Sequence, residues 1–137
     1  MTQLHQVAQH AEDLDRAASF YTKVLGGTMI ATFDPPGLAF VDLGGVRLLL
    51  ERAAPIALIY LRVPDVRAWV SQLRDSGVDI HTEPHRVHVD TDGAFGEPGW
   101  EEWMAFIRDS EGNLVGLAGR HAPPAQPAPA TGAPRRR

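Results

Sequence analysis

The chain has 137 residues, a formal net charge of −4 and no cysteine. This length suits one ordinary domain with its own core. The lack of cysteine excludes disulfides, thiolate metal sites and cysteine nucleophiles. An acidic chain repels phosphate backbones, so nucleic acid is not an expected partner. No apolar run reaches the ~20 residues that a membrane span requires, and no secretion signal is recognisable. We therefore expect a cytoplasmic protein with no membrane partner.

The first part of the chain predicts a strand, a helix, a further strand and a hairpin. Val7, Gln9 and Ala11 alternate as on one face of a strand, and a helical apolar stripe with i, i+3, i+4, i+7 spacing follows. Asp13 lies where an N-cap is expected, and Gly26 lies where a left-handed residue ends a helix. Residues 28–33 predict the next strand, and residues 37–51 predict a hairpin with glycines in its turn.

The second part repeats this pattern, which is the most informative feature of the sequence. Aligned on Asp65, a strand at 57–63 precedes a helix that ends at Gly77, and a hairpin at 103–118 has Gly112 in its turn. We predict an α+β fold of two tandem β-α-β-β-β modules, about 4–52 and 57–118, in a single domain of residues 1–120. One helix covers one sheet face, so a cavity between the curved mixed sheets is the natural place for a ligand.

Two further segments stand apart from the repeat. The polar segment 81–103 is longer than its counterpart in the first module, and we interpret it as a loop over the mouth of the cavity. Within it His85 and His88 are three residues apart, which in a regular strand places them on opposite faces and argues against a histidine pair on one metal. Residues 121–137 are rich in Pro and Ala, and we expect a disordered tail.

The helix "DLDRAASFYTKVLGG", the hairpin "FVDLGGVRLLLE" and the closing "MAFIRDSEGNL" resemble the vicinal oxygen chelate superfamily over about residues 4–118. This superfamily includes glyoxalase I, methylmalonyl-CoA epimerase, extradiol dioxygenases and bleomycin-resistance proteins. The resemblance implies that metal-using members hold a divalent ion with four side chains. The matching positions here are Gln6, Leu49, Leu58 and Gly116. Only glutamine offers a side-chain donor, so we expect no metal at the family positions and no other cofactor.

Other polar residues remain candidates for a site. Gln6, His10 and Glu51 share the cavity side of their strands and could form a displaced metal set if those strands are neighbours. Without a metal, His10, Glu51, His85 or Glu102 could serve as a general base, with Arg62 as an oxyanion partner. The full set of predicted ligand-binding residues is Gln6, His10, Glu51, Tyr60, Arg62, His85, Glu102 and Trp103.

These observations favour a small-molecule binder of the bleomycin-resistance type, or a metal-independent enzyme on the same scaffold. The alternative is a metal-dependent lyase or isomerase of the glyoxalase I or methylmalonyl-CoA epimerase type with displaced ligands. The one-sided sheets and the resemblance also lead us to expect a homodimer. Whether the chain is an enzyme depends largely on the meaning of Gly116, which stands where a metal-binding carboxylate is found in the family.

Overall fold

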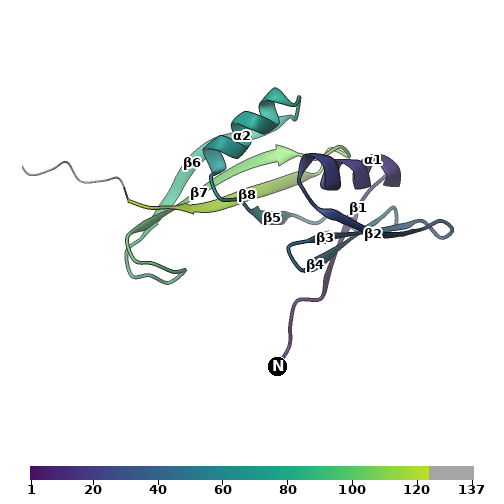
Figure 1. The fold of residues 1–137 in the computed structure, drawn as a ribbon, viewed down its shortest axis with the longest axis horizontal. Coiled ribbons are helices and arrows are strands. Elements are labelled where there is room, and N and C mark those ends of the chain that lie inside the picture. The colour runs from purple at the N-terminus through teal and green to yellow at the C-terminus, as the bar shows by residue number, and fades with distance from the viewer. Residues whose placement is uncertain (124–137) are drawn as a thin grey trace, which may run out of the picture.

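The computed structural model describes residues 1–123 and contains two four-stranded mixed sheets with a helix over each (Figure 1). The α+β class and the two β-α-β-β-β modules are confirmed. The first module comprises β1 (Gln6–His10), α1 (Leu14–Ser19), the π-helical segment η1 (Phe20–Val24), β2 (Thr28–Phe33), β3 (Leu38–Leu43) and β4 (Val46–Glu51). The second comprises β5 (Ile59–Arg62), α2 (Val66–Asp75), β6 (Ile80–Asp90), β7 (Trp100–Arg108) and β8 (Leu114–His121).

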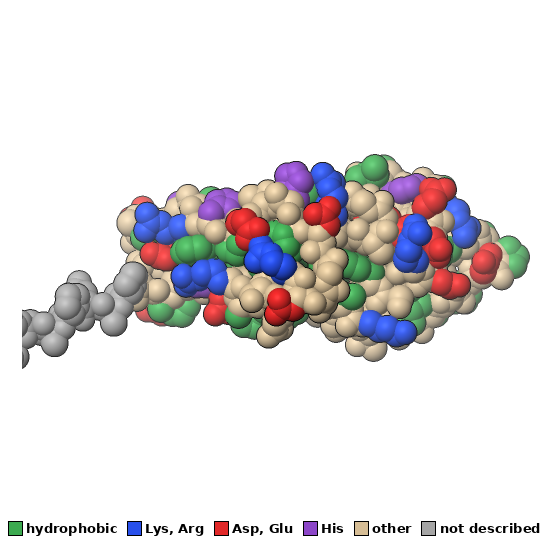
Figure 2. Space-filling model, turned by 90° about the horizontal axis from the view of Figure 1, so that it is seen from above, with side chains coloured by type: hydrophobic (Ala, Val, Ile, Leu, Met, Phe, Trp, Pro, Cys, Tyr) green, Lys and Arg blue, Asp and Glu red, His purple; other side chains and the backbone are tan. Residues whose placement is uncertain are grey.

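The two sheets have the same topology. Their strand orders are β1-β4-β3-β2 and β5-β8-β7-β6, and in each the first strand is parallel to the last while the other pairs are antiparallel. The modules lie side by side in an elongated molecule, with side chains of both charges scattered over the face seen from above (Figure 2). In the described part of the chain, no helix is both long and apolar enough to cross a membrane.

The predicted helix ends are confirmed. The Asp13 carboxylate accepts a hydrogen bond from the backbone N–H of Arg16 at 3.0 Å, and Asp65 accepts one from Ala68 at 3.2 Å. Each cap satisfies a backbone donor that has no partner within the helix. Gly26 and Gly77 follow the helices with φ of +83° and +86°, a conformation that costs glycine little.

Both helices cover the same side of the two sheets (Figure 1). Their apolar stripes bury Tyr21, Val41 and Leu50 in the first module, and Val70 and Leu117 in the second. Within residues 1–123 the opposite side of each sheet carries no helix, and we call it the open face. In the second sheet this face carries alternate residues of β5, β7 and β8: Tyr60, Arg62, Glu102, Met104, Phe106, Gly116, Ala118 and Arg120.

The structure corrects the interpretation of residues 81–103 as a loop. β6 continues to Asp90 and β7 begins at Trp100, so only nine residues connect them. Irregular pairing between these strands hides the alternation on which the sequence prediction depended. Pro84 is tolerated because β6 is an edge strand.

One of these irregularities also overturns the expected opposition of two histidines. His85 pairs with Met104 and His88 pairs with Glu102, so both histidines lie on the open face. At the other end of the module, β8 extends to His121, three residues beyond the predicted boundary. Most of the predicted tail, residues 124–137, lies outside the described residues.

Candidate ligand-binding site

Gly116 lies in β8 directly beneath the ring of Tyr60 from the neighbouring strand β5. A Cβ atom added at Gly116 would lie 2.5 Å from Cδ2 and 2.8 Å from Cε2 of that ring. The ring also contacts Phe106 edge to face, with centroids 5.8 Å apart. Tyr60 therefore occupies the space that a longer side chain at position 116 would need.

A pocket of about 600 Å³ lies beside Tyr60 on the open face of the second sheet. This volume is within the range of roughly 300–1,000 Å³ typical of small-molecule sites. Tyr60 remains half exposed and Phe95 is 67% exposed, so two aromatic rings are available to a ligand. We call this the open-face pocket; its other main lining residues are Arg62, Glu102, Ala118 and Arg120.

Arg120 holds the polar end of this pocket together. Its guanidinium donates to Glu102 Oε2 at 2.5 Å and to Asp90 Oδ2 at 2.7 Å. Asp90 in turn accepts hydrogen bonds from the backbone N–H groups of Ala94 and Phe95, at 2.8 and 3.0 Å. Burial alone would raise the Asp90 pKa, but these hydrogen bonds and Arg120 lower it. The ionised Asp90 thus fixes the β6–β7 loop and places Phe95 at the pocket.

The model of one protein family, described as the Glyoxalase/Bleomycin resistance protein/Dioxygenase superfamily, matches residues 3–117. The chain belongs to this superfamily. The match covers most of both modules and confirms the resemblance drawn from the sequence. No curated protein matches the sequence at a significant level.

Several solved structures share the fold. Lactoylglutathione lyase from Agrobacterium tumefaciens is 23% identical, with a TM-score of 0.65 over 87% of this chain and 94% of that one. UcmS2 is 25% identical, with a TM-score of 0.65 over 86% and 98%. A superfamily protein from Alicyclobacillus acidocaldarius is 19% identical, with a TM-score of 0.61 over 85% and 90%. At these identities the likeness establishes the architecture.

The four superfamily metal positions do not fit a metal in this chain. The Gln6 amide oxygen already accepts hydrogen bonds from Arg47 Nε and Nη2 at 3.2 and 2.9 Å. Leu49 and Leu58 carry no donor atom, and the space above Gly116 is filled by the Tyr60 ring. Hard divalent ions need several oxygen or nitrogen donors, which these side chains do not supply.

The displaced set proposed from the sequence does not converge either. His10 and Glu51 pair across β1 and β4, but Gln6 is four residues back along β1, a separation of about 13 Å. His10 is engaged elsewhere: its Nδ1 lies 2.9 Å from the carbonyl oxygen of Arg52. Within residues 1–123, no three His, Asp or Glu side chains are grouped so as to hold a metal ion.

The remaining predicted residues are divided between the two sides of the second sheet. Tyr60, Arg62 and Glu102 meet at the open-face pocket. His85 is exposed on the same face, with Nδ1 3.0 Å from the Glu83 carbonyl oxygen, and does not line the pocket. Trp103 lies on the helix side, where its ring contacts the Arg67 guanidinium at 4.5 Å and the His121 ring at 5.3 Å.

Of the main lining residues of the pocket, sequence reasoning missed Phe95, Ala118 and Arg120. Ala118 and Arg120 follow Gly116 at two-residue intervals, so strand alternation from Gly116 was a signal that could have found them. Arg120 was instead taken as the end of the domain. Phe95 lies in the β6–β7 loop, and its position depends on the hydrogen bonds to Asp90, for which the sequence offers no signal.

Proposed function

We propose that this chain is a small-molecule-binding protein of the superfamily that uses the open-face pocket without a divalent metal. The observation that carries the proposal is the position of Tyr60 over Gly116. In this arrangement an aromatic surface stands where a metal-using member presents a carboxylate. A site built this way is suited to stacking and shape recognition, while metal-assisted enediolate chemistry would lack its carboxylate.

The chemistry of the lining indicates the class of ligand. Tyr60 and Phe95 offer exposed rings, while Arg62, Glu102 and Arg120 provide both signs of charge. Because Glu102 and Asp90 already neutralise Arg120, the polar end of the pocket has no large excess of one charge. We therefore expect a planar, neutral or zwitterionic aromatic molecule rather than a polyanion.

The test is a ligand-observed NMR screen of aromatic compounds against the full chain, with hits located by backbone amide shifts. Ala118→Leu fills the open-face pocket and is expected to weaken the hits at least tenfold. Ala53→Leu, in the exposed turn after β4, is the matched control and should leave binding unchanged. Hits that bind Ala118→Leu with the same affinity as the parent would contradict the proposed site.

A second assay separates this proposal from the metal-dependent alternative. We expect no turnover of the methylglyoxal–glutathione hemithioacetal after addition of nickel, zinc or cobalt. Robust metal-stimulated turnover would overturn the proposal. The proposal also keeps the homodimer and the cytoplasmic location as expectations, because one-sided sheets favour association and the cysteine-free composition suits a reducing compartment.

A further inference from the structure

The two modules also differ in the loops of their closing hairpins. In the second module, five residues connect Arg108 to its partner Leu114. In the first, Gly44 and Gly45 alone connect Leu43 to Val46. The longer loop contacts His10 at the end of β1 and Glu12 just after it, whereas Gly44 lines a cleft with Leu4 and Val7 near the start of β1. The two loops therefore lie at opposite ends of the junction between β1 and β5. The loop of the second module is three residues longer, so it can cover its end of the junction more fully than the two-glycine turn covers the other end.

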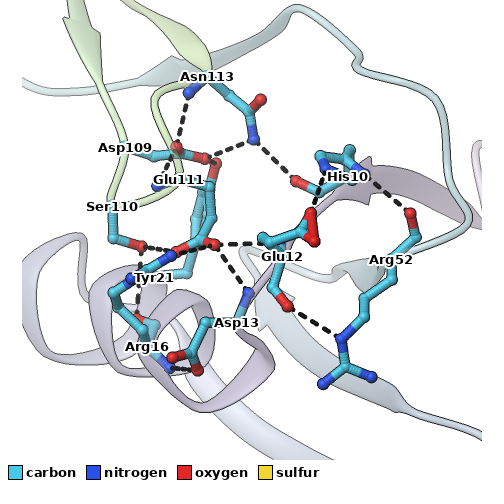
Figure 3. Close-up of polar contacts among 10 residues, drawn as sticks. All are labelled: His10, Glu12, Asp13, Arg16, Tyr21, Arg52, Asp109, Ser110, Glu111 and Asn113. Carbon is cyan, nitrogen blue, oxygen red and sulfur yellow. Dashed lines mark hydrogen bonds and ion pairs between the residues drawn. The ribbon is translucent and has the colours of Figure 1, made fainter.

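The longer loop closes its end of the junction (Figure 3). The Glu111 side chain is 1% exposed and accepts hydrogen bonds from the backbone N–H groups of Glu12 and Asp13 at 3.1 and 2.9 Å. It also forms an ion pair with Arg16 at 2.7 Å. Asn113 donates its amide to the His10 carbonyl oxygen at 2.8 Å. The start of α1 and the end of β1 are thus capped by the second module.

The two-glycine turn has no side chains with which to do the same at the other end. There a cleft of about 540 Å³ lies between the modules, and we call it the junction cleft. Hydrophobic side chains are visible among charged ones in the middle of the molecule, between its two halves (Figure 2). Val7 and Leu48 line the cleft from the first module, and Ile59, Leu61 and Trp69 line it from the second.

Among residues 1–123, two arginines line this apolar cleft and no Asp or Glu does. The Arg47 guanidinium contacts the Gln6 amide oxygen, His5 Nε2 at 2.9 Å and the Phe40 ring at 5.4 Å. None of the ion pairs within residues 1–123 involves Arg47 or Arg62. Arg52, Arg67 and Arg108 also lack an ion pair within residues 1–123, but they do not line the cleft, so Arg47 and Arg62 are the charges that a ligand there would meet.

We propose that the junction cleft is a second binding site, specific for a small organic carboxylate with an apolar body. A guanidinium donates two parallel hydrogen bonds to a carboxylate, which a neutral ligand cannot match. The hydrocarbon or aromatic body of the ligand lies between Val7, Leu48 and Trp69, where it leaves water for an apolar surface. The cleft shares Tyr60, Leu61 and Arg62 of β5 and the adjacent Val63 with the open-face pocket, whereas Arg47, Leu48 and Trp69 line only the cleft. The proposal does not depend on the proposed function.

The test is a backbone amide NMR titration of the full chain with sodium octanoate, with octanol as the uncharged probe of equal chain length. Octanoate is expected to shift the amides of Gly44 and Val46 and the indole of Trp69. Arg47→Gln is expected to weaken octanoate binding about tenfold or more. Arg86→Gln, which removes an exposed arginine outside the cleft, should not.

Other outcomes overturn the proposal. The first is the absence of shifts at about 10 mM octanoate, a concentration about ten times a weak dissociation constant of about 1 mM. The others are equal affinity for octanol and octanoate, and shifts centred on Phe95 and Ala118. Arg62→Gln provides a second charge-removing variant if Arg47→Gln fails to fold. Because Arg62 lines both sites, its effect is assigned to the cleft only if Ala118→Leu leaves octanoate binding intact. Ala118→Leu should leave octanoate binding intact, so failure of this site and failure of the open-face pocket are distinguishable.

Discussion

Tyr21 of the first module donates its hydroxyl to Asp109 of the second at 2.7 Å, and both side chains are buried (Figure 3). The carboxylate is fully satisfied, because the backbone N–H groups of Glu111 and Asn113 donate to its other oxygen at 2.8 Å each. Burial, together with the neighbouring Asp109, raises the Tyr21 pKa, so the phenol remains a donor. This contact links the helix of one module to the hairpin loop of the other.

Removing that donor should weaken the domain. Tyr21→Phe leaves Asp109 buried with one hydrogen bond fewer, and we expect the free energy of unfolding to fall by about 1–3 kcal/mol. Urea denaturation of the two proteins measures the difference. The matched control is Tyr60→Phe, because Tyr60 is half exposed, and its effect should stay within about 0.5 kcal/mol. If the two variants lost the same free energy of unfolding, the buried hydroxyl of Tyr21 would contribute no more to stability than the half-exposed hydroxyl of Tyr60.

Glu111 predicts an acid dependence of stability. Hydrogen bonding to Arg16 lowers its pKa from 4.5 to about 2, with further help from the Asp13 backbone N–H. A depressed carboxyl pKa stabilises the folded state above the unfolded value, and this contribution is lost as the pH falls from about 4.5 towards 2. The shift corresponds to roughly 3 kcal/mol at most. Urea denaturation between pH 6 and pH 3 should therefore show a steep loss of stability.

Substitution shows whether Glu111 is responsible. Glu111→Gln removes the titrating group, so the variant should be less stable at pH 6 and should lose less stability on acidification than the parent. Glu12→Gln is the matched control, since the Glu12 side chain is 74% exposed. If the free energies of unfolding of Glu111→Gln and the parent fell by the same amount between pH 6 and pH 3, Glu111 would not be the cause of the acid dependence.

The sequence predicted the fold well because the elements follow local rules. Asp13 and Asp65 cap helices, Gly26 and Gly77 end them, and the apolar stripes have helical spacing, so each signal is contained in a short window. The repeat then gave the topology, because each module must bury its one helix against its own sheet. These rules do not depend on contacts between the modules.

The candidate site was less predictable because it depends on how the strands of the second module pair and pack with one another. The bulged pairing of β6 places His85 and His88 on one face, against simple alternation. Trp103 was expected in the pocket, but its parity in β7 directs it to the helix side with Arg67. Conversely, the absence of a carboxylate at position 116 was visible in the sequence, while the ring of Tyr60 that fills its place was not.

The Tyr60–Gly116 contact makes a further prediction. In an ordinary strand Gly→Ala is stabilising by roughly 0.5–1 kcal/mol, because glycine loses more conformational freedom on folding. Here the new Cβ would collide with the ring, so Gly116→Ala should instead destabilise by about 1–3 kcal/mol. In a Tyr60→Ala background the same change should become neutral or stabilising. Thermal and urea unfolding of the four proteins of this cycle measure the coupling, and additive effects would contradict the clash.

The open faces predict association. Phe33 is 51% exposed and contacts Phe40 edge to face on the open face of the first sheet, and Leu58 is 52% exposed beside the second. Exposed apolar surface of this kind commonly marks an interface. We expect a homodimer by light scattering at micromolar concentration, and Phe33→Glu should shift it to monomer because burying a carboxylate without a partner is costly. Lys23→Glu, an exposed change on the helix side, is the control and should remain dimeric. A parent protein that scatters as a monomer, or a Phe33→Glu variant that stays dimeric, would rule out association through the open face.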